Sequence, residues 1–272
     1  MTLDTVRVLI AAGIFMLLLL LRLEAPRFGA AEYDEPARGR RAWKRLSWYA
    51  IGGLLLLALY TAHPSPHDTL LMLLGHRQAA LTAGLGLAIL GVAQAAGFAW
   101  FRYGDLRFPP AAEYPNGAVN ALATAVIDEV TFRGALLGSL VAVGVPDAPA
   151  VLLMTIVYLL ATRLAAPGHH PYVPLLAGAM GLAFGWATLA TGGLGAALVG
   201  HAATSFAVFV FTGHAGQVAV TGLEPDEIEW RTGIPEGWQR VRDGEAPGAG
   251  EAPEPGEAPE PGEVPERPTP RR

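Results

Sequence analysis

The sequence predicts an all-α protein: a polytopic membrane helical bundle of about seven to eight spans, followed by a disordered C-terminal tail rich in Pro and Glu. Hydrophobic residues make up 52% of the 272 positions, and the mean hydropathy is +0.35, values too apolar for an ordinary soluble domain. Apolar runs of about 20 residues, the length that crosses a bilayer as a helix, recur along the chain. The region from Gly213 onward instead holds 13 acidic and 6 basic residues, and from Glu245 its composition turns to Glu, Pro and Gly. A segment of that composition cannot bury a core.

Seven apolar runs are long enough to span, and most of the connections between them contain Pro, which breaks helices. The predicted spans are Thr5–Leu23, Leu46–Ala62, Ala79–Phe101, Val119–Val145, Ala148–Ala166, Tyr172–Thr191 and Leu194–Thr212. An eighth apolar piece, Thr69–Leu74, is too short to cross and is more typical of a loop or re-entrant turn. Gly and Ala are abundant within the spans, which favours close helix packing.

The distribution of basic residues predicts the orientation. The loop from Arg22 to Arg45 holds seven basic residues, whereas Thr61–Gln78 holds only Arg77. Because cytoplasmic loops are enriched in Lys and Arg, we expect the first loop in the cytoplasm. With seven spans the N-terminus is then outside and the acidic tail cytoplasmic. We expect an integral protein of the cytoplasmic membrane, with the lipid bilayer as its first partner.

We divide the chain into four parts: N-terminal spans with the basic loop (1–112), a core bundle (113–213), a short cytoplasmic segment (214–244) and a disordered Glu/Pro/Gly tail with a repeated hexapeptide (245–272). The sequence does not indicate what the tail binds. Lys and Arg are not clustered on one face, so we expect no nucleic-acid partner. The absence of Cys excludes thiolate metal sites and Cys nucleophiles.

Three charged residues lie inside the fourth predicted span, where a bilayer-length helix should carry none: Asp128, Glu129 and Arg133. Each costs at least about 2.5 to 3.5 kcal/mol on insertion scales, so an intramembrane cluster is by default a functional site. Glu129 and Arg133 are four positions apart and can pair on one helix face. No second basic residue is near Asp128 in the sequence. We therefore expect Asp128 to be unpaired and free to react.

Two further polar pieces follow, Tyr158–Thr162 in the next span and His201–Ser205 in the last. Together with Asp128–Gly134 they resemble, in order and spacing, the CAAX-protease and bacteriocin-processing family of intramembrane peptidases. That family's motifs are Glu-Glu-x-x-x-Arg, Phe-x-x-x-His and His-x-x-x-Asn. The resemblance covers roughly 119–211. The chain departs from the family in the shortened carboxylate of Asp128, in Thr162 where the motif has His, and in Ser205 where it has Asn.

The resemblance implies catalytic roles for Asp128, Glu129 and His201. Asp128 would be the base that activates water, Glu129 would pair with Arg133, and His201 would donate to the oxyanion, which is the chemistry that amide hydrolysis needs. The supporting residues are Arg133, Ser205, Thr162 and Tyr158. Ser205 would add a weaker hydroxyl donor, whereas Thr162 cannot act as a base near neutral pH. His169 and His170 follow Thr162 and we expect them in the next loop.

The resemblance predicts a hydrolase: an intramembrane endopeptidase of the CAAX type that cleaves a membrane-bound peptide or protein. The substitutions leave a second hypothesis open, a catalytically impaired relative that acts as a membrane binding or scaffold protein. A third, a transporter with Asp128 as its proton site, lacks the expected internal repeat. We expect no cofactor. Asp128, Glu129 and His201 would suit zinc, but without a second His that ligand set is thin.

Simpler structural roles are also open at each position. Glu129 and Arg133 would then be a buried ion pair that locks two helices, and Asp128 would pair with His201 across helices. The hypothesis of an active site predicts in addition where these residues lie, because intramembrane charges must face protein or water. It places Asp128, Arg133, His201 and Thr162 around one cavity that opens toward the cytoplasm.

Overall fold

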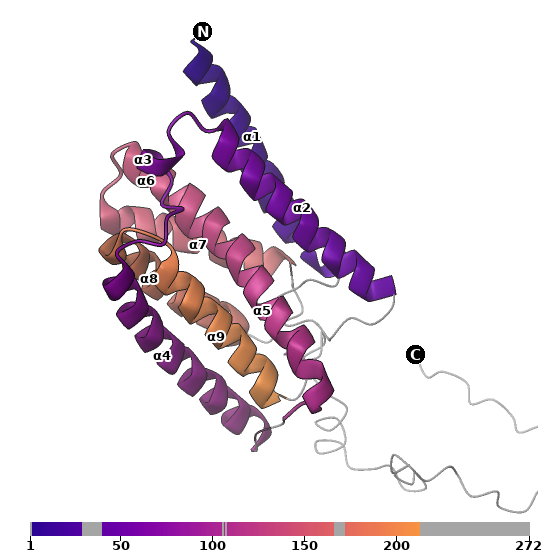
Figure 1. The fold of residues 1–272 in the computed structure, drawn as a ribbon. Coiled ribbons are helices and arrows are strands. Elements are labelled where there is room, and N and C mark those ends of the chain that lie inside the picture. Colours follow the sequence, from indigo (N-terminus) through magenta and orange to yellow (C-terminus); the bar gives the residue numbers. More distant parts are fainter. Residues whose placement is uncertain (1, 29–39, 105, 107, 166–171, 213–272) are drawn as a thin grey trace, which may run out of the picture. The chain divides into compact units, whose positions relative to one another are not determined.

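The computed structural model describes residues 2–28, 40–104, 106, 108–165 and 172–212, and within these ranges the chain is helical with no strand (Figure 1). The all-α fold class is confirmed. The long helices are α1 (Leu3–Leu23), α2 (Arg40–Ala62), α4 (Arg77–Tyr103), α7 (Asp147–Ala165), α8 (Tyr172–Thr191) and α9 (Gly195–Thr212). One further rod is built from three consecutive segments, α5 (Tyr114–Asp128), η3 (Glu129–Leu137) and α6 (Gly138–Ala142). Short helices are η1 (Ala25–Phe28), α3 (Pro66–Thr69) and η2 (Ala111–Glu113).

The helices confirm an integral membrane protein. Among the described residues, five are long and apolar enough to cross a bilayer: Leu3–Leu23, Ala42–Ala62, Arg77–Phe101, Pro174–Thr191 and Gly195–Thr212. Large apolar side chains such as Leu54, Leu85 and Leu175 point outward, as lipid-facing residues do. The other two predicted spans correspond to the α5–η3–α6 rod and to α7. The rod carries the charged motif, which lowers its hydropathy.

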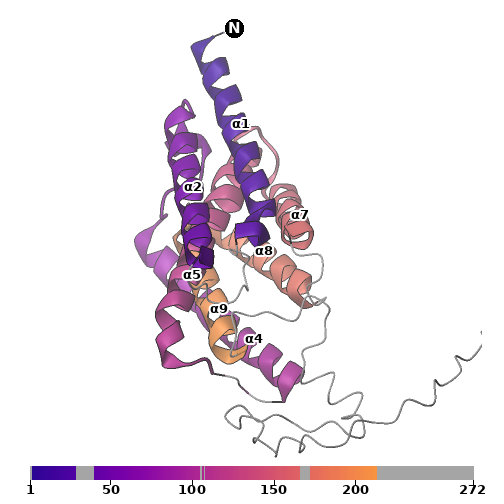
Figure 2. The same ribbon diagram turned by 90° about the vertical axis from the view of Figure 1, so that its right-hand side faces the viewer.

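The first two helices form a hairpin, and they run side by side in Figures 1 and 2. Arg7, in the first turns of α1, holds the far end of α2: its Nε donates to the Ala62 carbonyl over 3.1 Å and its Nη2 to the His63 carbonyl over 3.0 Å. These carbonyls belong to the C-terminal end of α2, where the last helical acceptors lack partners within the helix. The guanidinium therefore caps α2 and closes the hairpin.

Glycines let α4 and α9 approach closely, and Figure 1 shows these helices beside each other. A Cβ at Gly91 would lie 1.8 Å from Thr204 Oγ1, and one at Gly200 would lie 2.8 Å from Leu87 Cβ. Small residues at such crossings bring helix backbones together within a membrane. The packing fixes α9, and with it His201, against the rest of the bundle.

The segment Leu70–His76 is an irregular connection between α3 and α4, in agreement with the loop or re-entrant turn expected for Thr69–Leu74. Its backbone bonds to two distant places: Leu71 N–H donates to the Gly134 carbonyl over 3.2 Å, and the Leu73 carbonyl accepts from Leu194 N–H over 2.7 Å. One strap of backbone thus joins η3 to the start of α9. Both of these elements carry predicted site residues.

Gly138 provides a test of this strap, because a Cβ there would lie 2.6 Å from the Thr69 carbonyl oxygen and 2.8 Å from Leu71 N. Backbone atoms cannot move aside as a side-chain end can, so we expect Gly138→Ala to lower the free energy of unfolding by about 1 to 3 kcal/mol. Gly86, also within a helix, has nothing within 4 Å of a built Cβ. Thermal unfolding of Gly86→Ala should show no loss of stability, since Ala is the better helix former. Equal losses in both variants would contradict the role of the strap.

Several predictions concern parts of the chain outside the described residues. They include the short cytoplasmic segment expected for 214–244, the disorder expected for 245–272, and the loop expected around His169 and His170. The division of the chain into four parts also stays a prediction.

Candidate active site

The charged motif lies where the rod changes its helical geometry. α5 ends at Asp128, and η3, a π-helix of 9 residues, begins at Glu129. π-helical segments are rare, and they frequently occur at functional sites. Asp128, Glu129 and Arg133 are each 0% exposed. The motif is therefore buried within the bundle and does not face lipid.

Glu129 is the centre of a buried charged cluster. Its Oε1 lies 3.0 Å from Arg133 Nη1 and 2.7 Å from His201 Nδ1, and none of the three side chains is exposed. The predicted pairing of Glu129 with Arg133 is confirmed. His201 comes from α9, 72 positions further along the chain than Glu129. It pairs with Glu129, whereas the structural alternative predicted from the sequence was a pair with Asp128. Oε2 of Glu129 has no hydrogen-bond partner among the described residues.

Aromatic rings enclose this cluster. The Arg133 guanidinium lies 4.3 Å from the centre of the Tyr158 ring and 5.7 Å from that of Phe184. The Phe184 ring in turn is 6.0 Å from the His201 ring. A guanidinium over an aromatic face is stabilised by the ring quadrupole. Tyr158 thus lies against Arg133 in this cluster. Phe184 was missed, because an aromatic residue in an apolar helix carries no signal of its own.

Asp128 is paired, so the prediction of a free carboxylate was wrong. Arg22 Nε lies 2.9 Å from Asp128 Oδ1, with side-chain exposures of 3% and 1%. Arg22 is in the last turn of α1, 106 positions before Asp128, so the search for a basic residue close in sequence could not find it. A signal was present nonetheless: Arg22 closes the apolar run of the first predicted span, and an Arg within a span commonly pairs with an acidic side chain or with backbone carbonyls.

Thr162 and Ser205 each lie one helical turn beyond a residue of the cluster. Thr162 follows Tyr158 on α7 and is 5% exposed, and Ser205 follows His201 on α9 and is 4% exposed. Neither hydroxyl has a hydrogen-bond partner among the described residues. Buried polar atoms are nearly always satisfied, so each exception needs an explanation. A bound substrate that accepts from these hydroxyls would be one.

The predicted site residues are therefore brought together only in part. Glu129, Arg133, His201 and Tyr158 contact one another, while Asp128 turns toward α1. All are buried, so the cluster is closed in this conformation. Among the described residues, no three His, Asp or Glu side chains are gathered to hold a metal ion. The expectation of a site without cofactor stays a prediction.

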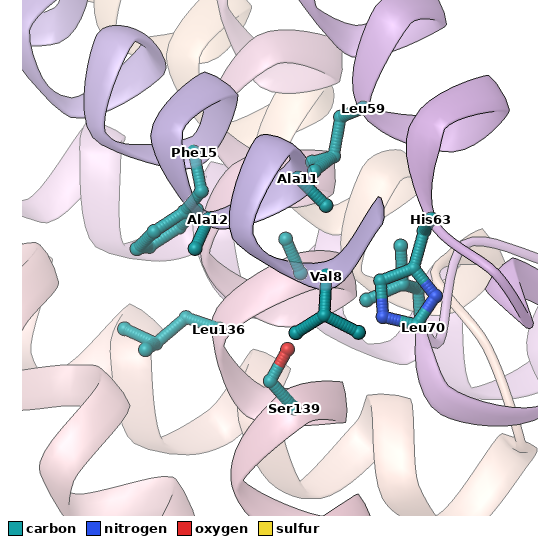
Figure 3. Close-up of a pocket in the computed structure, with 10 residues that line it drawn as sticks. Val8, Ala11, Ala12, Phe15, Leu59, His63, Leu70, Leu136 and Ser139 are labelled. Carbon is teal, nitrogen blue, oxygen red and sulfur yellow. The ribbon is translucent and has the colours of Figure 1, made fainter. Parts of the chain in front are cut away.

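A separate pocket of about 280 Å³ lies between α1, the end of α2 and the η3–α6 junction (Figure 3). Its lining is mostly apolar, with His63 and Ser139 as the polar exceptions. Burial lowers the pKa of His63, a hydrogen bond with the Ser65 backbone raises it, and the nearby Arg7 charge lowers it. None of the predicted site residues lines this pocket.

The family model described as Type II CAAX prenyl endopeptidase Rce1-like matches residues 110–207. The matched segment, about a third of the chain, begins just before α5 and ends within α9. It includes the whole Glu129 cluster. The resemblance to the CAAX-protease and bacteriocin-processing family is therefore confirmed over this segment. No curated protein and no solved structure matched the chain in the corresponding comparisons.

Proposed function

We propose that this chain is an intramembrane endopeptidase that hydrolyses a peptide bond of a membrane-bound substrate, with Glu129 and His201 as the reacting pair. The match to the Rce1-like model supports the reaction class. The observation that carries the proposal is the contact of 2.7 Å between Glu129 Oε1 and His201 Nδ1 in a buried site. A carboxylate that holds an imidazole in this way is a recurrent device of hydrolases.

The contact assigns a role to each ring nitrogen of His201. With Glu129 ionised, Nδ1 carries the proton and donates to the carboxylate, so Nε2 of the neutral ring is the acceptor. Nε2 would take a proton from the attacking water and later return it to the leaving amine, while Glu129 stabilises the imidazolium that forms in between. This assignment differs from the oxyanion role that the resemblance implied. It follows from the contact of His201 with Glu129 and from the pairing of Asp128 with Arg22, which makes Asp128 less suited as the base.

The charge that develops on the carbonyl oxygen needs donors held in place beforehand. We assign this role to the Arg133 guanidinium, which contacts Glu129, and to the Thr162 and Ser205 hydroxyls, whose oxygens have no hydrogen-bond partner among the described residues. In a site closed to water, such donors act far more strongly than in solution. Entry of a substrate requires the closed bundle to open, a step that sets the rate of many enzymes.

The test is hydrolysis of quenched fluorescent peptides, with and without a prenylated Cys, by the protein reconstituted in bilayers. We expect His201→Gln to lower the rate about 10² to 10⁴-fold, the usual contribution of a positioned acid–base group. His67 is the matched control: it is exposed, and its Nε2 is 2.8 Å from the Tyr60 hydroxyl. His67→Gln should cleave like wild type. Equal cleavage rates in wild type and His201→Gln would contradict the proposal that Glu129 and His201 are the reacting pair.

A second function has its own observation in its favour. Asp128, which the family motif would use as base, is held by Arg22, and Thr162 stands where the motif has His. A protein so altered would bind a membrane-bound peptide in the same place and release it unchanged. In that case wild type and His201→Gln would bind the prenylated peptide with the same Kd, and neither would cleave it.

The orientation is proposed from the basic first loop. We expect reporters fused at Arg40 and Gly250 to be cytoplasmic and a reporter at Pro66 to be outside, because Lys and Arg concentrate on the cytoplasmic side. Glycosylation or alkaline phosphatase reporters would measure this. A reporter at Gly250 that reads outside would mean a different number of spans and would reverse the site's orientation.

A further inference from the structure

The α1–α2 hairpin is docked onto α5 by polar contacts with Asn120 and with Asp128, where the charged motif begins. Arg22 of α1 lies 2.9 Å from Asp128. The Trp48 indole N–H, from α2, donates to the Leu21 carbonyl over 2.9 Å, next to Arg22 in the chain. The Tyr49 hydroxyl donates to Asn120 Oδ1 on α5. Each of the three helices thus contributes to one polar seam.

An apolar cluster surrounds the same seam. Leu21, Ala25, Trp48 and Ile127 form a buried core, and Ile127 is the residue before Asp128. α2 passes so close that a Cβ at Gly52 would lie 2.6 Å from Ile127 Cδ1. Close-packed cores have few alternative arrangements and transmit displacements. A movement of Arg22 would therefore reach the end of α5.

The Arg22–Asp128 ion pair lies at the junction between α5 and η3, directly before Glu129. Asp128 is the last residue of α5, and the next residue, Glu129, opens the π-helix. The Arg22 and Asp128 side chains are 3% and 1% exposed, and in such a place each charge depends on the other. Arg22 lies outside the segment that matches the family model. The pairing therefore joins the N-terminal hairpin to the segment that matches the family model.

We infer that Arg22 is a positioning residue for the Glu129–His201 pair: by binding Asp128 it pins the start of η3 and so sets where the Glu129 carboxylate lies. Asp128 then serves as the anchor for the N-terminal hairpin, and the hairpin is part of the site. This inference deepens the proposed function and rests on it for its kinetic consequence only. Its structural consequence, a change in the contact between Glu129 and His201, holds whether or not the protein cleaves.

The first readout is the ¹⁵N resonance of His201 in protein labelled at His, assigned by its absence in His201→Gln. The ring nitrogens report the hydrogen bond to Glu129 directly. We expect Arg22→Gln to displace this resonance well below the melting temperature, and Arg22→Lys, which keeps the charge, to restore it toward wild type. Loss of stability alone would not move the resonance. An unchanged His201 resonance in folded Arg22→Gln overturns the inference.

Arg27 provides the matched control. It lies five positions after Arg22 and is paired with Glu24 over 2.8 Å, but on the surface, with side-chain exposures of 80% and 42%. Arg27→Gln should leave both the His201 resonance and the melting temperature at wild-type values, since exposed pairs contribute little. A displacement as large as that of Arg22→Gln would show a general effect of charge and count against the inference.

If Arg22→Gln does not fold, the double variant Arg22→Met with Asp128→Leu replaces both charges by apolar groups of similar volume. Buried pairs replaced in this way usually leave a folded protein. We expect its His201 resonance to be displaced as well, because the directed contact is lost. A wild-type resonance in this variant overturns the inference as clearly as one in Arg22→Gln.

Kinetics separate this inference from the proposed function. If wild type cleaves the peptides, Arg22→Gln should lower kcat by about 10²-fold, the cost of misplacing reacting groups by about an ångström, with KM nearly unchanged. Cleavage by wild type together with an unaltered kcat in Arg22→Gln would refute positioning and leave the peptidase. No cleavage by wild type would refute the peptidase, and the His201 resonance would still decide the role of Arg22.

Discussion

Arg133→Met is expected to lower the free energy of unfolding by about 3 to 5 kcal/mol, the usual cost of removing one partner from a buried ion pair. The guanidinium lies 3.0 Å from Glu129 Oε1, and both side chains are 0% exposed. Without it, the Glu129 charge is left with the His201 ring in a site closed to water. Met fills much of the volume of the aliphatic part of Arg133. The loss of unfolding free energy therefore comes mainly from the missing charge and less from a cavity.

The control is Arg27→Met, which removes an Arg from an exposed pair and should cost about 0 to 1 kcal/mol. Both variants would be unfolded by heat or denaturant in the same detergent. Arg133 also covers the Tyr158 ring at 4.3 Å, which adds to its expected loss. A value for Arg133→Met no larger than that for Arg27→Met would show that the cluster is hydrated and open, contrary to the structure.

Thr162→His is expected to raise peptide cleavage by about 10² to 10⁴-fold, since it supplies the imidazole of the family's second motif as an additional acid–base group. The position is suited to this change: Thr162 lies one turn beyond Tyr158 on α7, and its hydroxyl has no hydrogen-bond partner among the described residues. The larger ring should cost about 1 to 3 kcal/mol of stability by overpacking. Cleavage rate and melting temperature would be measured on the same preparation.

Thr155→His is the matched control, because Thr155 is also 5% exposed on α7 and lies about two turns before Thr162. It should lose stability similarly and gain no activity. The companion change Asp128→Glu would bring back the longer carboxylate of the family motif. We expect little further gain from it, because Arg22 holds this position. A destabilised and inert Thr162→His would favour the binding protein over the peptidase.

The fold class, most of the helix bounds and the resemblance to the CAAX-protease family over residues 110–207 could be predicted from the sequence. Helices α1, α8 and α9 begin and end within two residues of the predicted spans, because bilayer length and hydropathy act locally along the chain. The pairing of Glu129 with Arg133 was also predictable, since the two residues are one turn apart. Family motifs of this kind are local patterns and can be read without coordinates.

Which groups meet across helices could be seen only from the packing of the helices. His201 binds Glu129 from 72 positions away, Asp128 is paired with Arg22 of the first helix, and Phe184 closes the cluster. The physical reason is that helix periodicity places residues on a face but does not say which helix that face will meet. In this protein the glycine contacts between α4 and α9 and the docking of the hairpin on α5 make that choice. As a result, Asp128, which was expected to be unpaired, binds Arg22, and Glu129 contacts both Arg133 and His201 at the centre of the charged cluster.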